Sequence, residues 1–212
     1  MNGTLRIAVF ASGRGSNLRA IWDAIESGSI PNALISLVIS NNSGSGALEI
    51  ARSNSIPSLH LCREQFESDM ALDDAILSGL REHRVNFIVL AGYMKKIAPT
   101  IIKAFRNRIV NIHPALLPSF GGPGMYGRFV HEAVINSGAA ISGATVHVVD
   151  EEYDHGRIIL QQSVPVDPGE TAESLAAKIS EIEHELYPRA IRMFAEAATP
   201  PGELHPVNLN EA

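Results

Sequence analysis

Five short apolar runs, each but the last followed by a stretch with helical spacing, constrain the fold of this chain more than any other feature. They read RIAVFAS, ALISLVIS, SLHLC, VNFIVLAGYM and IVNIHP. Between them apolar residues recur at helical intervals, as in Leu72, Ile76 and Leu80. Strands that alternate with helices in this way form a mostly parallel sheet with helices on both faces.

The last third of the chain has a different pattern. ISGATVHVVD and GRIILQQSVPV alternate as strands do and are joined by EEYDHG, so they are expected to extend the same sheet in mixed orientation. Residues 171–197 show a long helical pattern, and Pro188 inside it is expected to kink or divide the helix. The sequence predicts a doubly wound α/β sheet, with one domain over residues 1–200 and a loosely ordered tail over residues 201–212.

Composition and charge exclude several classes of protein. The chain has 212 residues, 45% of them hydrophobic, and a net charge of −6, which argues against a nucleic-acid binder because such proteins present a basic face. The single cysteine, Cys62, excludes an internal disulfide and a Cys-rich zinc site, and we expect it to be half-buried. The apolar run Ile7–Ala11 is too short for a signal peptide or a membrane span, so a cytoplasmic protein is expected.

A glycine-rich turn, SGRGSN, joins the first predicted strand to a helix. Gly13 and Gly15 allow a close backbone approach, and the free N–H groups of a helix N-terminus attract an anion. The spacing matches neither the dinucleotide-binding pattern nor the P-loop pattern. The turn therefore predicts either a site for one terminal phosphate of a small substrate or an ordinary turn capped by Ser or Asn.

Two polar residues stand at the carboxyl end of the fifth predicted strand. Asn111 and His113 alternate along it, so their side chains point to the same side. An amide can donate to an oxygen that is becoming negative, and an imidazole exchanges protons near neutral pH. Pro114 and Pro118 stiffen the segment after this strand, and Leu117–Pro118 is the best candidate for a cis bond, which the sequence does not decide.

A carboxylate is the third candidate at this site. A charge run such as DEEYD is usually solvated surface, but one carboxylate turned inward beside His113 would orient the imidazole and raise its pKa. The residues alone do not choose between Asp150 and Asp154. The glycine-rich segment 121–133 is expected to be a mobile loop, with His131 facing the substrates.

Six motifs in order carry a resemblance to a known family. VFASGRGSNL, VISNN, IVLAGYMKKI, IVNIHPALLPSF, GATVHVVDEEYDHGRIILQQSVPV and IEHELYP resemble the phosphoribosylglycinamide formyltransferases, over about residues 6 to 195. The resemblance implies a doubly wound sheet of about seven strands. It also implies transfer of a formyl group from 10-formyltetrahydrofolate, as co-substrate, to the amino group of glycinamide ribonucleotide in purine synthesis, with no metal.

The resemblance also implies a role for particular residues. The implied catalytic residues are Asn111, His113 and Asp154, the last through the pattern D-x-x-x-D-x-G. The implied sites for the ribonucleotide phosphate and ribose are Gly15, Ser16, Asn17 and Glu183. The implied folate-binding residues are Met94, Lys95, Lys96, Ile97 and Asn111. The expected mechanism places Asn111 and a protonated His113 on the oxyanion, with Asp154 supporting the charged imidazole and a water that carries a proton.

The chain departs from the family at the site of the folate glutamate tail. Lys95 and Lys96 stand where the family often has Arg followed by Ile or Leu, and Asp69 stands where some members have Arg. A carboxylate cannot pair with that tail, so the positive charge is expected from Lys95, Lys96 or Arg63.

Several alternatives remain open on the sequence alone. A formyltetrahydrofolate hydrolase shares the core but usually has an N-terminal regulatory domain, and a methionyl-tRNA formyltransferase carries a C-terminal RNA-binding domain for which this chain is expected to be too short. A non-catalytic nucleotide-binding module would not need all three of Asn111, His113 and Asp154. A dehydrogenase-type domain lacks support without the third glycine. The sequence predicts small-molecule substrates, no nucleic acid and no membrane, and it does not distinguish a monomer from a homodimer.

Overall fold

The computed structural model describes residues 3–197, so the predicted tail over residues 201–212 lies outside the described residues. The strands are β1 (Leu5–Phe10), β2 (Ala33–Ser40), β3 (Ser58–His60), β4 (Phe87–Leu90), β5 (Ile109–His113), β6 (Ile141–Val148) and β7 (Ile158–Pro165). The helices are α1 (Ser16–Glu26), α2 (Gly46–Ser53), α3 (Asp69–Glu82), α4 (Pro99–Ala104), α5 (Arg128–Ser137) and α6 (Ala172–Ala197), with a 3-10 turn, η1 (Arg63–Gln65).

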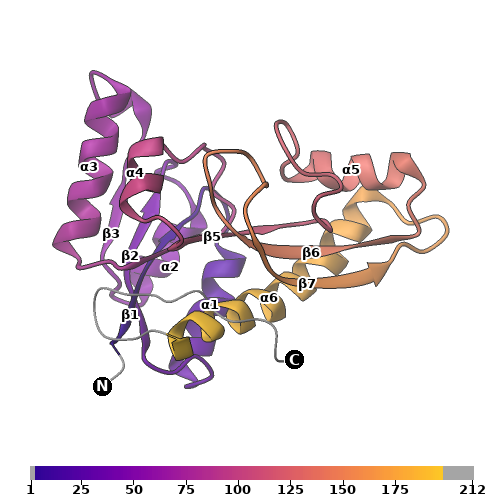
Figure 1. Cartoon of the computed structure of the whole chain (residues 1–212), viewed down its shortest axis with the longest axis horizontal. Helices are drawn as coiled ribbons and strands as arrows, with labels where there is room; N and C mark the ends of the chain where they lie inside the picture. Colours follow the sequence, from indigo (N-terminus) through magenta and orange to yellow (C-terminus); the bar gives the residue numbers. More distant parts are fainter. Residues whose placement is uncertain (1–2, 198–212) are drawn as a thin grey trace.

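The strands form one sheet in the order β3-β2-β1-β4-β5-β6-β7 (Figure 1). The first five strands run parallel, whereas β5 with β6 and β6 with β7 are antiparallel. This arrangement confirms the predicted doubly wound, mostly parallel sheet of seven strands with an antiparallel extension.

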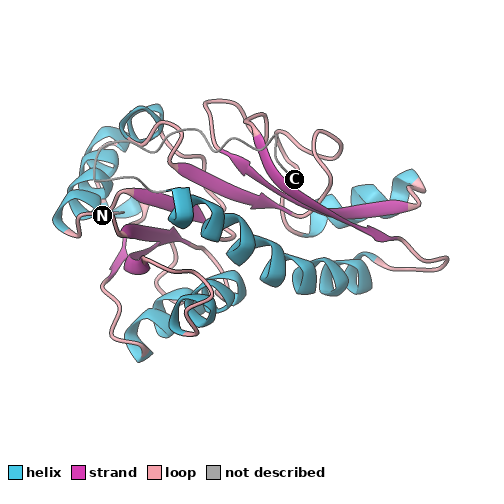
Figure 2. Cartoon of the chain, turned by 60° about the horizontal axis from the view of Figure 1, so that its bottom comes forward, coloured by secondary structure: helices cyan, strands magenta, loops and turns pink. Residues whose placement is uncertain are grey.

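Helices cover both faces of the parallel part of the sheet (Figure 2). Ile7 and Val9 of β1 pack in one core with α1, α2 and α6, and Ala8 and Phe10 pack in a second core with α3 and α4. Strand residues alternate between the two faces, so a strand covered on both sides reads as a continuous apolar run. For this reason the first strands appear in the sequence as uninterrupted apolar runs.

Helix α6 runs past Pro188 without interruption, so the expected division of the helix is wrong. On its buried face, Tyr187 donates its hydroxyl hydrogen between the carbonyl oxygens of Leu90 and Val110, at 3.0 Å from each. This contact joins α6 to β4 and β5. It places Glu183, one helical turn before Tyr187, at the carboxyl edge of the sheet.

Helix α5 was not predicted. Residues 128–133, the second half of the segment expected to be a mobile loop, form its beginning, and residues 121–127 precede it. The irregular, glycine-rich part ends at Gly127, and helical structure begins at Arg128. Val130 and Val134 are buried at helical spacing, but the helix is short and follows several glycines, which weakened its signal. Within residues 3–197, no helix has the length and apolar character needed to cross a membrane.

The strand order reverses direction between β1 and β4. From β1 the chain moves outward to β2 and β3, and then returns to β4 on the other side of β1. In open α/β sheets the crevice at such a switch point, beyond the carboxyl ends of the strands, is the usual ligand site. The turn Gly13–Asn17 follows β1, and the segment Ala91–Ile97 follows β4, so both lie at this crevice.

Candidate active site

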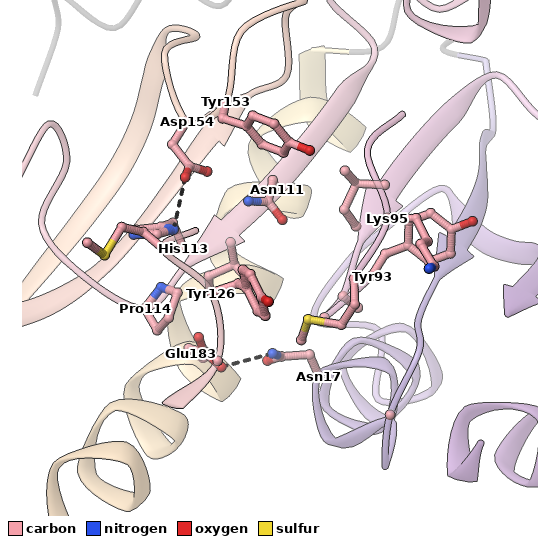
Figure 3. Close-up of a pocket in the computed structure, with 18 of the residues that line it drawn as sticks. Asn17, Tyr93, Lys95, Asn111, His113, Pro114, Tyr126, Tyr153, Asp154 and Glu183 are labelled. Atoms are coloured by element: carbon pink, nitrogen blue, oxygen red, sulfur yellow. Dashed lines mark hydrogen bonds and ion pairs between the residues drawn. The ribbon is translucent and has the colours of Figure 1, made fainter. Parts of the chain in front are cut away.

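A cavity of roughly 710 Å³ opens at this edge of the sheet, which is a size that suits a substrate or a cofactor. One end is formed by the turn after β1 and by α6, and the other end by the segment after β4. The carboxyl end of β5, the strand next to β4, contributes Asn111 and His113 to the same wall (Figure 3). All the residues that the family resemblance implied for catalysis or substrate binding line this cavity: Gly15, Ser16, Asn17, Met94, Lys95, Lys96, Ile97, Asn111, His113, Asp154 and Glu183.

Asn111 and His113 both face the cavity from the end of β5, as their alternation predicted. The Asn111 amide Nδ2 lies 3.2 Å from Nε2 of His147. His113 is only 3% exposed, and its Nε2 lies 2.8 Å from the carbonyl oxygen of Phe120, to which it donates. The Leu117–Pro118 bond between these residues is cis. The folded loop therefore already engages one nitrogen of the imidazole.

The carboxylate that turns inward is Asp154. Its Oδ2 lies 3.5 Å from Nδ1 of His113 and accepts a hydrogen bond from the Gly122 N–H at 3.0 Å, and its Oδ1 lies 3.5 Å from Nε2 of His147. Asp150, the alternative that the sequence left open, instead lies 3.0 Å from Nδ1 of His155 at the exposed rim. The structure thus places Asp154, and not Asp150, between two buried imidazoles.

Burial and nearby charges determine the protonation of His113 and Asp154. Burial lowers the pKa of His113 and outweighs the opposite effects of the Asp154 charge and of the Phe120 carbonyl. The imidazole is therefore neutral at pH 7 in the protein without substrates, and the protonated His113 expected on the oxyanion stays a prediction about the reaction. Burial alone would raise the pKa of Asp154, but its polar neighbours, among them the Gly122 N–H, lower it, so this carboxylate stays ionised.

The turn after β1 has the features of an anion site. Gly15 adopts a left-handed φ of 81°, and an added Cβ would lie 2.9 Å from Cα of Ala47, so only glycine fits. Helices α2 and α3 are capped by the side chains of Ser45 and Ser68, whereas no side chain caps the first turn of α1. A Ser or Asn cap, which the ordinary-turn alternative predicted, is therefore wrong, and the first N–H groups of α1 have no side-chain partner next to lining residues 13–17.

Asn17 and Glu183 meet at the same end of the cavity. Asn17 donates from Nδ2 to Oε2 of Glu183 at 2.9 Å, and its own Oδ1 is buried without a hydrogen-bond partner among the described residues. Burial raises the pKa of Glu183 to about 7, and the hydrogen bond from Asn17 opposes the shift only in part. A carboxylate and an unpaired amide oxygen are acceptors, and they suit a ligand that carries hydroxyl groups.

The segment after β4 is held against the turn after β1. The Met94 N–H donates to the Ser12 hydroxyl at 2.8 Å, which joins the segment after β4 to the turn after β1. Lys96 places its ammonium 5.1 Å from the centre of the Tyr153 ring, an attractive contact at the cavity rim. Arg63 pairs instead with Asp69 at 2.5 Å and does not line the cavity. Of the three proposed cations, Lys95 and Lys96 remain at the wall.

Two buried histidines on the cavity wall were not assigned a catalytic role from the sequence. His147 is 2% exposed and pairs directly with Asn111 across β5 and β6. His131 is 6% exposed, with Nδ1 buried and unpaired among the described residues, and burial lowers its pKa. The alternation of GATVHVV predicts a strand that contains His147. That Asn111 is its partner depends on the pairing of β6 with β5.

Comparisons with known proteins agree with this geometry. A family model described as formyl transferase matches residues 5–191. Phosphoribosylglycinamide formyltransferase from Haemophilus influenzae is 42% identical over 191 residues, which are 90% of this chain and 87% of that protein. The chloroplastic phosphoribosylglycinamide formyltransferase of Vigna unguiculata is 44% identical over 90% of this chain, and this chain spans 61% of its length.

A solved structure shares both the fold and much of the sequence. The crystal structure of glycinamide ribonucleotide transformylase 1 from Symbiobacterium toebii matches with a TM-score of 0.85 and 40% identity, over 91% of this chain and 88% of that one. The family model covers the strands, the glycine-rich turn and the whole Asn111, His113 and Asp154 set. The chain therefore belongs to the formyl transferase family, and its relatives there include phosphoribosylglycinamide formyltransferases.

Proposed function

We propose that this protein transfers a formyl group from 10-formyltetrahydrofolate to the amino group of glycinamide ribonucleotide, in purine biosynthesis. The observation that carries the proposal is a single cavity with two different ends and with polar groups of β5 in the same wall. One end has an uncapped helix N-terminus and the acceptors Asn17 and Glu183, which suit a phosphorylated ribose. The other end has the wall at Met94–Ile97, which suits the pterin of the folate.

Positioning supplies much of the rate in this proposal. The two substrates bind at these two ends, so that the amine and the formyl carbon meet beside Asn111 and His113. Holding two reactants in this way contributes roughly 7–11 kcal/mol to lowering the barrier. The residues at the centre then need only to stabilise charge and to move one proton.

The chemical step is an addition followed by an elimination. The free amine attacks the formyl carbon, the carbonyl electrons move to oxygen, and a tetrahedral intermediate with an oxyanion forms. A hydrogen of the Asn111 amide donates to this oxygen. The attacking nitrogen gives up a proton, the leaving folate nitrogen gains one, and the bond between the formyl carbon and that nitrogen breaks.

Asp154 and His113 carry the proton between the two nitrogens. Because Nε2 of His113 donates to Phe120, its Nδ1 is the free basic atom, and it faces Asp154 Oδ2 at 3.5 Å. A proton that arrives on Nδ1 forms an ion pair with Asp154, which stabilises the imidazolium. A water ordered by Asp154 completes the path to the folate nitrogen. That no metal takes part stays a prediction, as does the domain boundary at residue 200.

The test is an assay with the purified protein and both substrates. Tetrahydrofolate release that depends on glycinamide ribonucleotide is the expected result, with one formylated ribonucleotide for each folate released. Release without the ribonucleotide would show a hydrolase, and no release would contradict both activities. A cytoplasmic location belongs to the same proposal, and fractionation of cells with an antibody against the chain tests it.

A further inference from the structure

His147 lies behind the proposed catalytic groups and contacts two of them. It stands directly opposite Asn111 in the antiparallel pair of β5 and β6 and is 2% exposed. Its Nε2 lies 3.2 Å from Asn111 Nδ2 and 3.5 Å from Asp154 Oδ1. A side chain at this position acts on the reaction through Asn111 and Asp154. Which ring nitrogen of His147 carries the hydrogen determines whether it donates to them or accepts from them.

The backbone determines which nitrogen of His147 carries the hydrogen. Nδ1 lies 3.0 Å from the carbonyl oxygen of Val148, and a carbonyl oxygen can only accept a hydrogen bond. The hydrogen of the neutral ring is therefore on Nδ1. A neutral imidazole has a single N–H, so Nε2 is left with a lone pair and can only accept.

This lone pair determines the orientation of the Asn111 amide. At 3.2 Å from Nε2, the nitrogen Nδ2 of Asn111 is the donor, and the reversed amide would place two acceptors against each other. Asp154 Oδ1, also an acceptor, stays at 3.5 Å from the same Nε2, beyond the usual range of a hydrogen bond. The distances thus agree with a ring whose Nε2 carries no hydrogen.

We propose that His147 is a positioning residue that acts as the Nδ1–H tautomer and holds the Asn111 amide with Nδ2 turned toward it. Asn111 then keeps the second hydrogen of Nδ2 for the developing oxyanion and presents Oδ1 separately to the cavity. The consequence for the reaction rests on the proposed function, whereas the tautomer and the amide orientation do not.

Nitrogen NMR of the ¹⁵N-labelled protein without substrates tests the tautomer. At a pH of about 8, His147 is expected to show a protonated Nδ1 and an unprotonated Nε2, the rarer form of histidine. His113, whose Nε2 donates to Phe120, is expected to show the opposite form in the same spectrum. The signal that disappears in His147→Gln assigns the residue. A protonated Nε2 on His147 would overturn the proposal whatever the protein catalyses.

Kinetics of two variants test the effect on the reaction. His147→Phe fills the space but offers no acceptor, so kcat is expected to fall roughly tenfold to a hundredfold while KM for either substrate changes little. His147→Gln keeps an acceptor oxygen and is expected to recover part of this loss. His83→Gln, at the end of α3, is the matched control with unchanged kcat.

The outcomes separate positioning from folding. Thermal unfolding of each variant shows whether the fold is intact, and His147→Gln together with the NMR measurement decides the question where His147→Phe does not fold. A His147→Phe protein that folds and keeps its kcat would overturn the positioning role. Absence of transferase activity in the unmodified protein would instead contradict the proposed function, and the NMR result would stand independently.

Discussion

Asn17 on α1 donates a hydrogen bond to Glu183 on α6 at 2.9 Å, across 166 residues of sequence. The contact joins the first and the last described helices at one end of the cavity. It holds a carboxyl group whose pKa is raised by burial next to the turn that offers free N–H groups to an anion. The proposed ribonucleotide site is thus completed only when both ends of the described chain are folded together.

The raised pKa of Glu183 predicts a pH-dependent stability. Its pKa rises from 4.5 to about 7 on folding, so the folded protein holds the proton more tightly than the unfolded chain. The contribution of protonated Glu183 to the free energy of unfolding is fully present below pH 4.5 and is lost as pH rises through about 7. Glu183→Gln has no such loss, so relative to the wild type its free energy of unfolding should gain roughly 1–3 kcal/mol between about pH 5 and pH 8.

Chemical denaturation at both pH values measures this change. Glu181→Gln, at an exposed position of the same helix, is the control and should show no such dependence. An equal effect of Glu183→Gln at both pH values would contradict the raised pKa.

Asn111→Ala and Asp154→Asn should each lower kcat by about 10²–10³-fold, because each removes a group that acts on the reacting atoms. Their melting temperatures should change little, since both residues lie at the end of a strand or in a loop and not in the apolar core. The control is Glu151→Gln, an exposed neighbour in the same loop. Near wild-type turnover by either variant would remove the role assigned to that residue.

Gly15→Ala should weaken the binding of inorganic phosphate and of the ribonucleotide. The substitution forces an L residue into a left-handed φ of 81° and places Cβ 2.9 Å from Cα of Ala47, so the turn must shift, at a cost of about 1–3 kcal/mol. Gly13→Ala is the matched control, because its added Cβ meets no atom within 4 Å. Isothermal calorimetry and thermal unfolding of both variants measure the difference, and equal affinities would contradict the assignment.

Hydrogen exchange provides a second view of the same turn. Saturating phosphate or ribonucleotide should slow exchange of the backbone amides of residues 13–18, because those at the start of α1 have no partner within the helix. The amides of α3, on the other face of the sheet, should exchange at the same rate with and without ligand. Unchanged exchange over residues 13–18 would contradict the phosphate site.

Lys95→Ala and Lys96→Ala should each raise KM for 10-formyltetrahydrofolate, by roughly twofold to fivefold, because an exposed charge pair contributes up to about 1 kcal/mol. Their kcat should be unchanged, since the lost contact is equal in the ground and transition states. Arg63→Ala is the control: its guanidinium already pairs with Asp69 away from the cavity. A larger effect of Arg63→Ala than of either lysine variant would reverse the assignment.

The fold class and the positions of most elements followed from the sequence, because they depend on local periodicity. Five apolar runs predicted β1 to β5, and the alternation of residues predicted that Asn111 and His113 share one side. Two predictions about helices failed, and each failure has a physical reason. Helix α5 is short and follows several glycines, and α6 continues through Pro188 because its buried face packs against the sheet through Tyr187.

The composition of the site beyond these residues was decided by tertiary structure. Whether Asp150 or Asp154 faces His113 depends on how the loop between β6 and β7 closes, and the sequence spacing is compatible with both. The protonation of His113 depends on the balance between burial and one nearby charge, and burial prevailed. The place of His147 behind Asn111 depends on the register of two strands that are distant in sequence. Local patterns determine which residues share a face, but only the packed chain determines their partners and their exposure to water.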